Sequence, residues 1–159
     1  MHPRAAEFKD CAAEAYDFEV RVHEFPEGTK TAADAAEAIG CSVAQIASSI
    51  AFEANGSLVV VITSGAHRVD EEKLASLVDA NPETVSMANA DRIKDTLGWS
   101  IGGVPPFCHD ADVPVYMDET LREYDELWAA AGTPEAVFPI APDRLIALAN
   151  PTIADVATD

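Results

Sequence analysis

The chain has 159 residues, enough for one domain that buries about two thirds of its unfolded surface, so neither a disulfide nor a metal is required to hold the fold. Its formal net charge is -18, from 28 acidic against 10 basic residues. A field of that sign argues against DNA as a partner, because phosphate binding depends on lysine and arginine. Hydrophobic residues still make up 48% of the chain, which excludes general disorder.

The acidic, alanine-rich and lysine-poor composition predicts a protein from a high-salt cytoplasm. In molar salt the electrostatic screening length falls to about 3 Å, so an acidic surface neither unfolds the domain nor strongly repels a polyanion. The alternative interpretation is an ordinary acidic protein.

The cysteines at positions 11, 41 and 108 are odd in number and widely spaced, without a Cys-x-x-Cys pair. We expect three free thiols, no metal and no cofactor. The first residues, MHPRAAEFKD, contain no apolar signal region, and no segment approaches 18 apolar residues. The expected protein is therefore soluble and cytoplasmic, with no membrane partner.

Hydrophobic periodicity predicts the elements of the first half of the chain. They are a helix over residues 3–16, a strand over 18–25, a helix over 31–40, a helical turn over 42–46, and strands over 48–54 and 57–63. Thr31 suits the N-cap of the second helix. Asn55-Gly56 is typical of a β-hairpin turn, and the apolar segment Leu58 to Ile62 predicts a central strand.

The second half predicts a helix over 70–79, a short strand over 84–88, a helix over 89–97 ended by Gly98, a strand over 113–117, a short helix over 119–124, strands over 127–131 and 136–140, and a helix over 142–149. Leu74, Leu77 and Val78 share one face of the first of these helices. Pro139 predicts an edge position for the last strand, because proline cannot donate to a ladder.

Strands interspersed with short helices, without a repeat or a linker, are typical of an α+β or α/β fold. We assign the α+β class and a single domain over residues 1–159. About seven strands predict a mixed sheet that curls or closes like a barrel, flanked by short helices.

The segment from Gly98 to His109 reads GWSIGGVPPFCH. Gly102 and Gly103 permit positive φ and close backbone approach, while the two following prolines fix φ and withhold amide donors. The amides of Gly102, Gly103 and Val104 are therefore expected to be free, and they could stabilise a developing oxyanion in acyl transfer. A tight bend between strands is the structural alternative.

Five segments of the chain, taken together, form a specific ordered set: TAADAA from Thr31, QIASSIAF from Gln45, RVDEEKL from Arg68, GGVPPF from Gly102, and Met117-Asp118. In their order and separations they resemble the YbaK/EbsC family, the editing domains associated with prolyl-tRNA synthetase, and the resemblance covers nearly the whole chain. The resemblance implies a barrel-like mixed sheet and a deacylase that acts on the 3′ aminoacyl-adenosine end of a tRNA. Editing of small amino acids such as alanine or cysteine, loaded on the proline tRNA, suits a second hydrolytic site, because one pocket discriminates poorly against smaller side chains. Prolyl-tRNA synthetase is the implied protein partner.

The resemblance also implies which residues form the site. Gly102 and Pro106 match the Gly-x-x-x-Pro loop that holds the aminoacyl end, with Gly103, Val104 and Phe107 alongside. The family usually carries glycine where this chain has Cys108, which is expected to narrow or chemically alter the pocket rim.

The lysine essential to the family corresponds here to Ser48, followed by Ser49, and these two are the catalytic candidates. Loss of a charged hydrogen bond typically costs about 1.5 to 3 kcal/mol. No Gly-x-Ser-x-Gly elbow surrounds them, so neither is expected to be a nucleophile. The remaining substrate-binding candidates and possible water-polarising groups are Lys30, Thr31, His67, His109 and Asp118.

Lys30 has two interpretations: it replaces the missing charge, or it is a solvated surface residue. The whole chain leaves three hypotheses open. It is a deacylase acting in trans, a catalytically silent domain that binds aminoacyl ends or a protein, or a binder of small apolar molecules with a closed pocket.

Overall fold

The computed structural model describes residues 1–25 and 31–158, so Lys30 and the predicted break from Pro26 to Thr29 lie outside the described residues. The described helices are α1 (Pro3–Tyr16), α2 (Ala32–Ile39), α3 (Glu71–Leu77), α4 (Ala90–Leu97) and α5 (Pro142–Ala149). The strands are β1 (His23–Glu24), β2 (Ile46–Ala54), β3 (Ser57–Ser64), β4 (Ser86–Met87), β5 (Val115–Asp118), β6 (Leu127–Ala130), β7 (Ala136–Ile140) and β8 (Thr152–Ala154).

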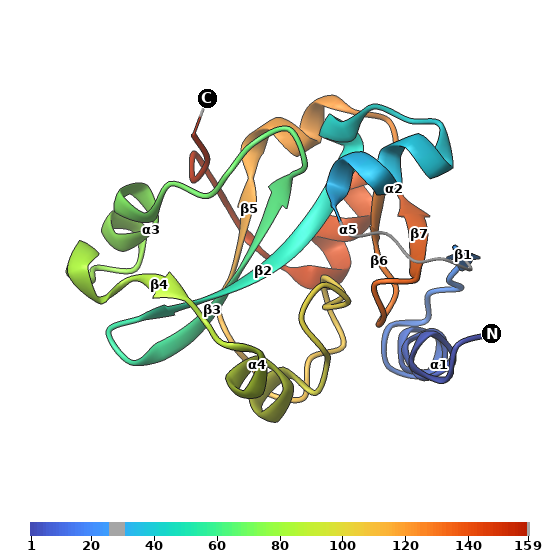
Figure 1. Cartoon of the computed structure of the whole chain (residues 1–159), viewed down its shortest axis with the longest axis horizontal. Coiled ribbons are helices and arrows are strands. Elements are labelled where there is room, and N and C mark those ends of the chain that lie inside the picture. The colour runs from blue at the N-terminus through green and yellow to red at the C-terminus, as the bar shows by residue number, and fades with distance from the viewer. Residues whose placement is uncertain (26–30, 159) are drawn as a thin grey trace.

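One mixed sheet contains all eight described strands, in the order β1-β7-β6-β2-β3-β5-β8, with β4 paired to β2 beside this path. The α+β class with a mixed sheet flanked by helices is confirmed. Of the two expected forms, curled or closed, the sheet is not closed, since β1 and β8 are separate edges. The long antiparallel pair β2–β3 crosses the middle of the molecule (Figure 1). Parallel pairs β2–β6 and β3–β5 flank it.

Local signals account for the best-predicted elements. The Thr31 hydroxyl accepts a hydrogen bond from the Asp34 amide at 3.1 Å, and Gly40 ends α2 with a φ of 86°. Asn89 caps α4 in the same way, and Gly98 ends it. Asn55-Gly56 forms the predicted hairpin turn, with positive φ at both residues. These features depend on side chains within a few residues of the element's end.

Two predictions about strands need correction, and one strand was not predicted. Of the strand predicted over 18–25, only His23–Glu24 pairs with β7. Residues 18–22 instead bury Val20, and partly Phe18, against the core without a ladder partner. The strand that contains Pro139, β7, is not at the edge of the sheet, because β1 pairs with it. β1 pairs only with Ala136 and Val137, however, so Pro139 lies beyond the end of β1 and has no partner there that needs its amide. β8 has no counterpart among the sequence predictions.

The main core lies between one face of the sheet and helices α1, α4 and α5. An aromatic cluster at its centre joins α1 to the loop after α4: Phe8 lies 5.4 Å from Phe107 and 5.0 Å from Phe138 between ring centroids. A smaller core beneath α3 covers the opposite face. Leu74 on α3 is fully buried in it, whereas Leu77, at which α3 ends, is 39% exposed.

The expectation of three free thiols is also wrong. Cys11 on α1 and Cys108 form a disulfide, with Cα atoms 6.3 Å apart, and Cys41 is the free cysteine. The 97 residues between the two cysteines gave no indication of proximity, which results from packing of α1 on the loop that contains Cys108. No helix within the described ranges is long and apolar enough to cross a membrane.

Candidate functional site

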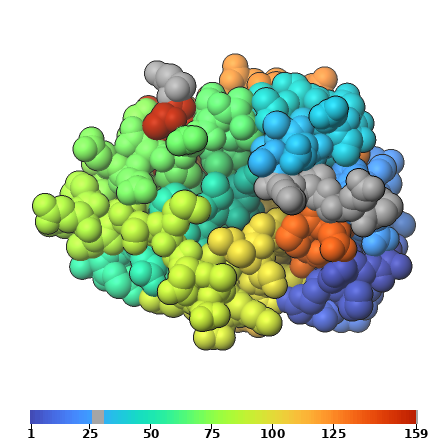
Figure 2. Space-filling view, in the orientation of Figure 1, coloured from blue at the N-terminus to red at the C-terminus, as the bar shows by residue number. Residues whose placement is uncertain are grey.

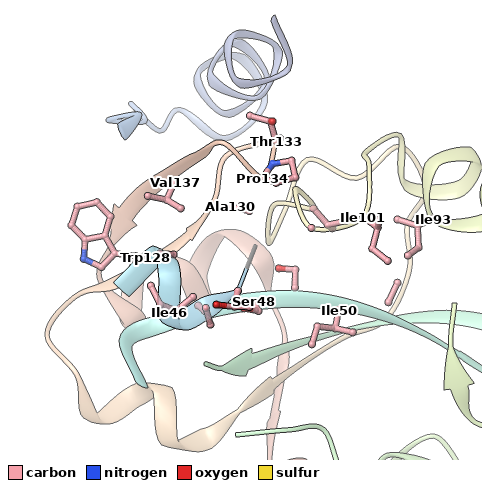
Figure 3. Close-up of a pocket in the computed structure, with 18 of the residues that line it drawn as sticks. Ile46, Ser48, Ile50, Ile93, Ile101, Trp128, Ala130, Thr133, Pro134 and Val137 are labelled. Atoms are coloured by element: carbon pink, nitrogen blue, oxygen red, sulfur yellow. The ribbon is translucent and has the colours of Figure 1, made fainter. Parts of the chain in front are cut away.

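A pocket of about 500 Å³ lies beside β2, where the neighbouring strands separate. Its lining comes from α2, β2, the β4–α4 segment, the loop after α4, and the β6–β7 hairpin. In Figure 3, Ser48 and Ile50 on β2 lie below the pocket, the hairpin residues Val137 and Pro134 lie on one side, and Ile93 and Ile101 lie on the other.

The pocket opens to solvent, because Met87 and Ile101 in its lining are 58% and 50% exposed. Figure 2 shows this face, with the teal of β2 recessed between green and yellow segments on one side and blue and orange ones on the other. The pocket therefore lacks the closed form that would have favoured a binder of small apolar molecules.

The structure brings five of the predicted site residues together in this lining: Thr31, Ser48, Ser49, Gly102 and Val104. Ser49 is notable because its hydroxyl oxygen is buried and has no hydrogen-bond partner among the described residues. None of the described lining residues is Asp, Glu, Lys, Arg or His. The described lining is therefore neutral, and its polar character comes from hydroxyl and main-chain groups.

The Gly-x-x-x-Pro loop divides between the pocket and the core. Gly102, with a φ of 84°, and Val104 line the pocket, and neither amide donates to an acceptor within the described part of the chain. The Gly103 amide is not free as expected: it donates to the carbonyl of Ser100 at 3.0 Å. A Cβ on Gly103 would lie 2.6 Å from Cα of Thr133, so this glycine lets the loop lie against the β6–β7 turn.

Pro106 and Phe107 are buried outside the pocket lining. Phe107 packs in the aromatic cluster, which fixes the loop on the core. Cys108 does not form the rim, because its sulfur bonds to Cys11. Its φ of 67° explains why glycine suits this position, since the left-handed region is costly for other residues.

His67 and Asp118 form a pair of their own outside the pocket lining. Nδ1 of His67 lies 3.0 Å from Oδ2 of Asp118, and the amide and hydroxyl of Thr120 donate to Oδ1 at 3.0 and 2.8 Å. Burial by itself raises the pKa of the Asp118 carboxyl, but these hydrogen bonds and one from the Ser64 amide outweigh it, so the pKa lies below its usual value.

His109 is also separate from the pocket. Its Nε2 donates to the carbonyl of Pro105 at 2.7 Å, and burial, opposed by that hydrogen bond and by Asp110, lowers its pKa. A neutral ring held in this way supports the prolines of the loop.

Sequence reasoning missed one whole wall of the pocket. Trp128, Ala130, Thr133, Pro134 and Val137 come from the β6–β7 hairpin, which periodicity described only as two strands and a turn. Gly132-Thr133-Pro134 was the available signal, because such a turn can approach another backbone closely.

The comparisons agree with this arrangement. The model of the aminoacyl-tRNA editing domain matches residues 26–148. The chain belongs to this family. The uncharacterised protein YwhH of Bacillus subtilis is 29% identical over 78% of either chain. EbsC of Enterococcus faecalis, a proposed Cys-tRNA(Pro)/Cys-tRNA(Cys) deacylase, is 25% identical over 80% of this chain and 77% of its own. The crystal structure of a proposed trans-editing enzyme for prolyl tRNA synthetase superposes with a TM-score of 0.93 at 34% identity, over 100% of this chain and 99% of that one.

Replacement of Gly102 by alanine tests the loop in this editing domain. The positive φ predicts a loss of about 1–2 kcal/mol in the free energy of unfolding. The new Cβ would lie 3.3 Å from Cγ of Pro134, so it also narrows the pocket, and a non-hydrolysable aminoacyl-adenosine should bind more weakly. Gly40→Ala is the matched control, because its φ is 86° and a Cβ there meets nothing within 4 Å. Equal binding by the two variants would make Gly102 a purely structural residue.

The Asp118 carboxyl predicts a pH dependence of stability. Because its pKa is lowered in the folded protein, its contribution is fully present above the unfolded value of about 3.9 and is lost as pH falls through the folded value. We expect the unfolding free energy of the wild type to fall more steeply below about pH 4 than that of Asp118→Asn. Urea titrations of both proteins at pH 7 and from pH 4.5 downward would measure the difference, and parallel curves would contradict it.

Proposed function

We propose that this protein is an aminoacyl-tRNA deacylase acting in trans, which hydrolyses the ester of a small amino acid, such as alanine or cysteine, carried by the proline tRNA. One observation carries the proposal: in a chain of the editing family, a single open pocket brings Ser48 and Ser49 of β2 together with the amides of Gly102 and Val104. The names of EbsC and of the trans-editing enzyme support the choice of substrate.

The proposed reaction is addition of water to the ester carbonyl, followed by loss of the ribose hydroxyl. The bond between the acyl carbon and the ribose oxygen breaks, and the water oxygen forms the new bond, so that the products are the free amino acid and the tRNA with its terminal hydroxyl restored. Negative charge develops on the carbonyl oxygen in between. The amides of Gly102 and Val104 are donors that can stabilise it without reorganising, and the hydroxyls of Ser48 and Ser49 can position the attacking water.

A panel of mischarged tRNAs tests this function directly. The purified protein is incubated with alanyl- and cysteinyl-tRNA carrying the proline anticodon, and with seryl-tRNA, at 0.1 M and at molar potassium chloride. We expect release of alanine or cysteine well above the buffer rate. Release no faster than buffer with every substrate at both salt concentrations would exclude the deacylase.

A silent binding domain is the second candidate, and the absence of any charged side chain in the described pocket lining favours it. A family site that depends on an ammonium group has only the Ser48 hydroxyl at that position. Tight binding of a non-hydrolysable aminoacyl-adenosine, without release in the tRNA panel, would identify this function.

Ser48→Lys distinguishes the two candidates. The side chain lines the pocket and is half-buried, so an ammonium group placed there would reach the aminoacyl ester. We expect deacylation to rise by about tenfold, the scale of one charge-assisted hydrogen bond, with little change in the melting temperature. Ser48→Met is the control, because it adds a chain of similar length without the charge. A destabilised and inactive lysine variant would show that Ser48 belongs to a remodelled pocket.

A further inference from the structure

The hydrogen-bond ladder of β2 has a gap on the edge that faces the pocket. β3 pairs with β2 continuously from Ala47 to Ala54. On the opposite edge, β6 pairs only with Ile46 and Ala47, and β4 only with Phe52 and Glu53. Among the described residues, no strand covers positions 48–50 on that edge.

The main chain of Ser49 points into this gap. In an antiparallel ladder, the amide and carbonyl of each residue point to the same side, and successive residues alternate. The Ile46 carbonyl accepts from Gly65, next to β3, whereas the Ala51 carbonyl accepts from Ala88, next to β4. Ser49 lies two positions before Ala51 on β2, so its amide and carbonyl point in the same direction as those of Ala51. Both groups therefore face away from β3 and toward the pocket that Ser49 lines.

The gap therefore offers one donor and one acceptor, spaced as in a strand, inside a pocket whose described lining has no charged side chain. An α-ammonium group cannot form an ion pair with such a lining and must bind to carbonyl or hydroxyl oxygens. An aminoacyl ester presents its α-ammonium donor and its carbonyl acceptor on adjacent carbons, as an amino acid residue in a strand does.

We propose that the aminoacyl group binds to the open edge of β2 as a one-residue strand. The Ser49 carbonyl accepts a hydrogen bond from the α-ammonium group, and the Ser49 amide donates one to the carbonyl oxygen of the ester. This is strand addition reduced to a single residue. The inference rests on the proposed function and deepens it, because it names the group that recognises the substrate's amino acid.

This binding mode does not require the lysine that Ser48 replaces. A main-chain donor on the ester carbonyl does not depend on any side chain of β2, so it survives the presence of Ser48 at the lysine position. It also requires a free α-ammonium group on the substrate, since an acyl group on that nitrogen would meet the β2 backbone.

Amide hydrogen exchange in the unaltered protein tests the proposal, with 3′-deoxy-3′-(alanylamino)adenosine as the non-hydrolysable probe. In the free protein, the Ser49 amide should exchange at least about tenfold faster than those of Ser48 and Ile50, which point toward β3. Saturating probe should slow the Ser49 amide by about tenfold or more. The propionylamino analogue, which lacks the α-ammonium group, should bind about tenfold more weakly, as expected from the loss of one charged hydrogen bond.

Two variants separate the main chain from the hydroxyl. Ser49→Ala keeps both main-chain groups and should bind the probe within about threefold of the wild type. Ser49→Pro removes an amide that takes no part in pairing with β3, and it should bind the probe about tenfold or more weakly than the wild type. Binding by Ser49→Ala as weak as that by Ser49→Pro would assign the contact to the hydroxyl and overturn the proposal.

The outcomes also separate this proposal from the function on which it rests. If the probe shifts the resonances of other pocket residues but leaves exchange at Ser49 unchanged, the strand-like mode is wrong and the deacylase remains. If the probe binds nowhere at millimolar concentration, both are wrong.

Discussion

Phe8→Ala should lower the free energy of unfolding by about 3–5 kcal/mol, the usual cost of removing a fully buried phenylalanine. Phe8 is the residue of α1 that contacts three other aromatic rings, those of Trp99, Phe107 and Phe138, with centroids 6.2, 5.4 and 5.0 Å away. In a chain of this length, such a loss lowers the melting temperature by on the order of 10 °C.

The same substitution should weaken the pocket, because two of its walls depend on Phe8. Phe107 belongs to the Gly-x-x-x-Pro loop, and Gly132, at the turn of the β6–β7 hairpin, lies so close that a Cβ on it would be 3.2 Å from that of Phe8. Urea denaturation and probe binding measure the two effects. Leu77→Ala, at a site 39% exposed, is the control and should change stability by no more than about 0.5 kcal/mol.

A loss of less than about 1 kcal/mol in Phe8→Ala would contradict this account of the core. It would mean that α1 packs only loosely and that the loop is positioned by other contacts.

Loss of the disulfide between Cys11 and Cys108 should cost about 2–4 kcal/mol, because the bond closes a long loop in the unfolded chain, with 97 residues of separation. Cys11→Ser is the appropriate variant, since it leaves Cys108 and its left-handed backbone in place. Melting temperatures with and without reductant measure the effect in the wild type. Cys41→Ser, which removes the free cysteine, is the control and should behave as the wild type.

Thiol titration of the unfolded, unreduced protein checks the same bond. We expect one reactive thiol, that of Cys41. Three thiols and no effect of reductant would show that Cys11 and Cys108 are not joined. Reduction should also weaken probe binding, because Cys108 connects the end of the Gly-x-x-x-Pro loop to α1.

The sequence by itself determined those features that neighbouring residues control. The cap at Thr31, the helix end at Gly98, the Asn55-Gly56 turn and the apolar strand from Leu58 to Ile62 were all predicted, because a cap, a turn or a buried strand depends on side chains a few positions apart. The ordered motifs from Thr31 to Asp118 also sufficed to indicate the editing family.

The tertiary structure decided which of those motifs share a site. Ser49 and Gly102 meet at one pocket, whereas Phe107 and Asp118 lie outside its lining, although all four belong to segments that indicated the family. The pairing of Cys11 with Cys108, the strand β8 beside β5, and the hairpin wall at Trp128 likewise join segments far apart in the chain. The hydrophobic periodicity of a sequence indicates which face of an element is buried, but not which other element buries it. The gap along β2 depends on where β6 and β4 stop pairing with it, so it could be found only in the folded protein.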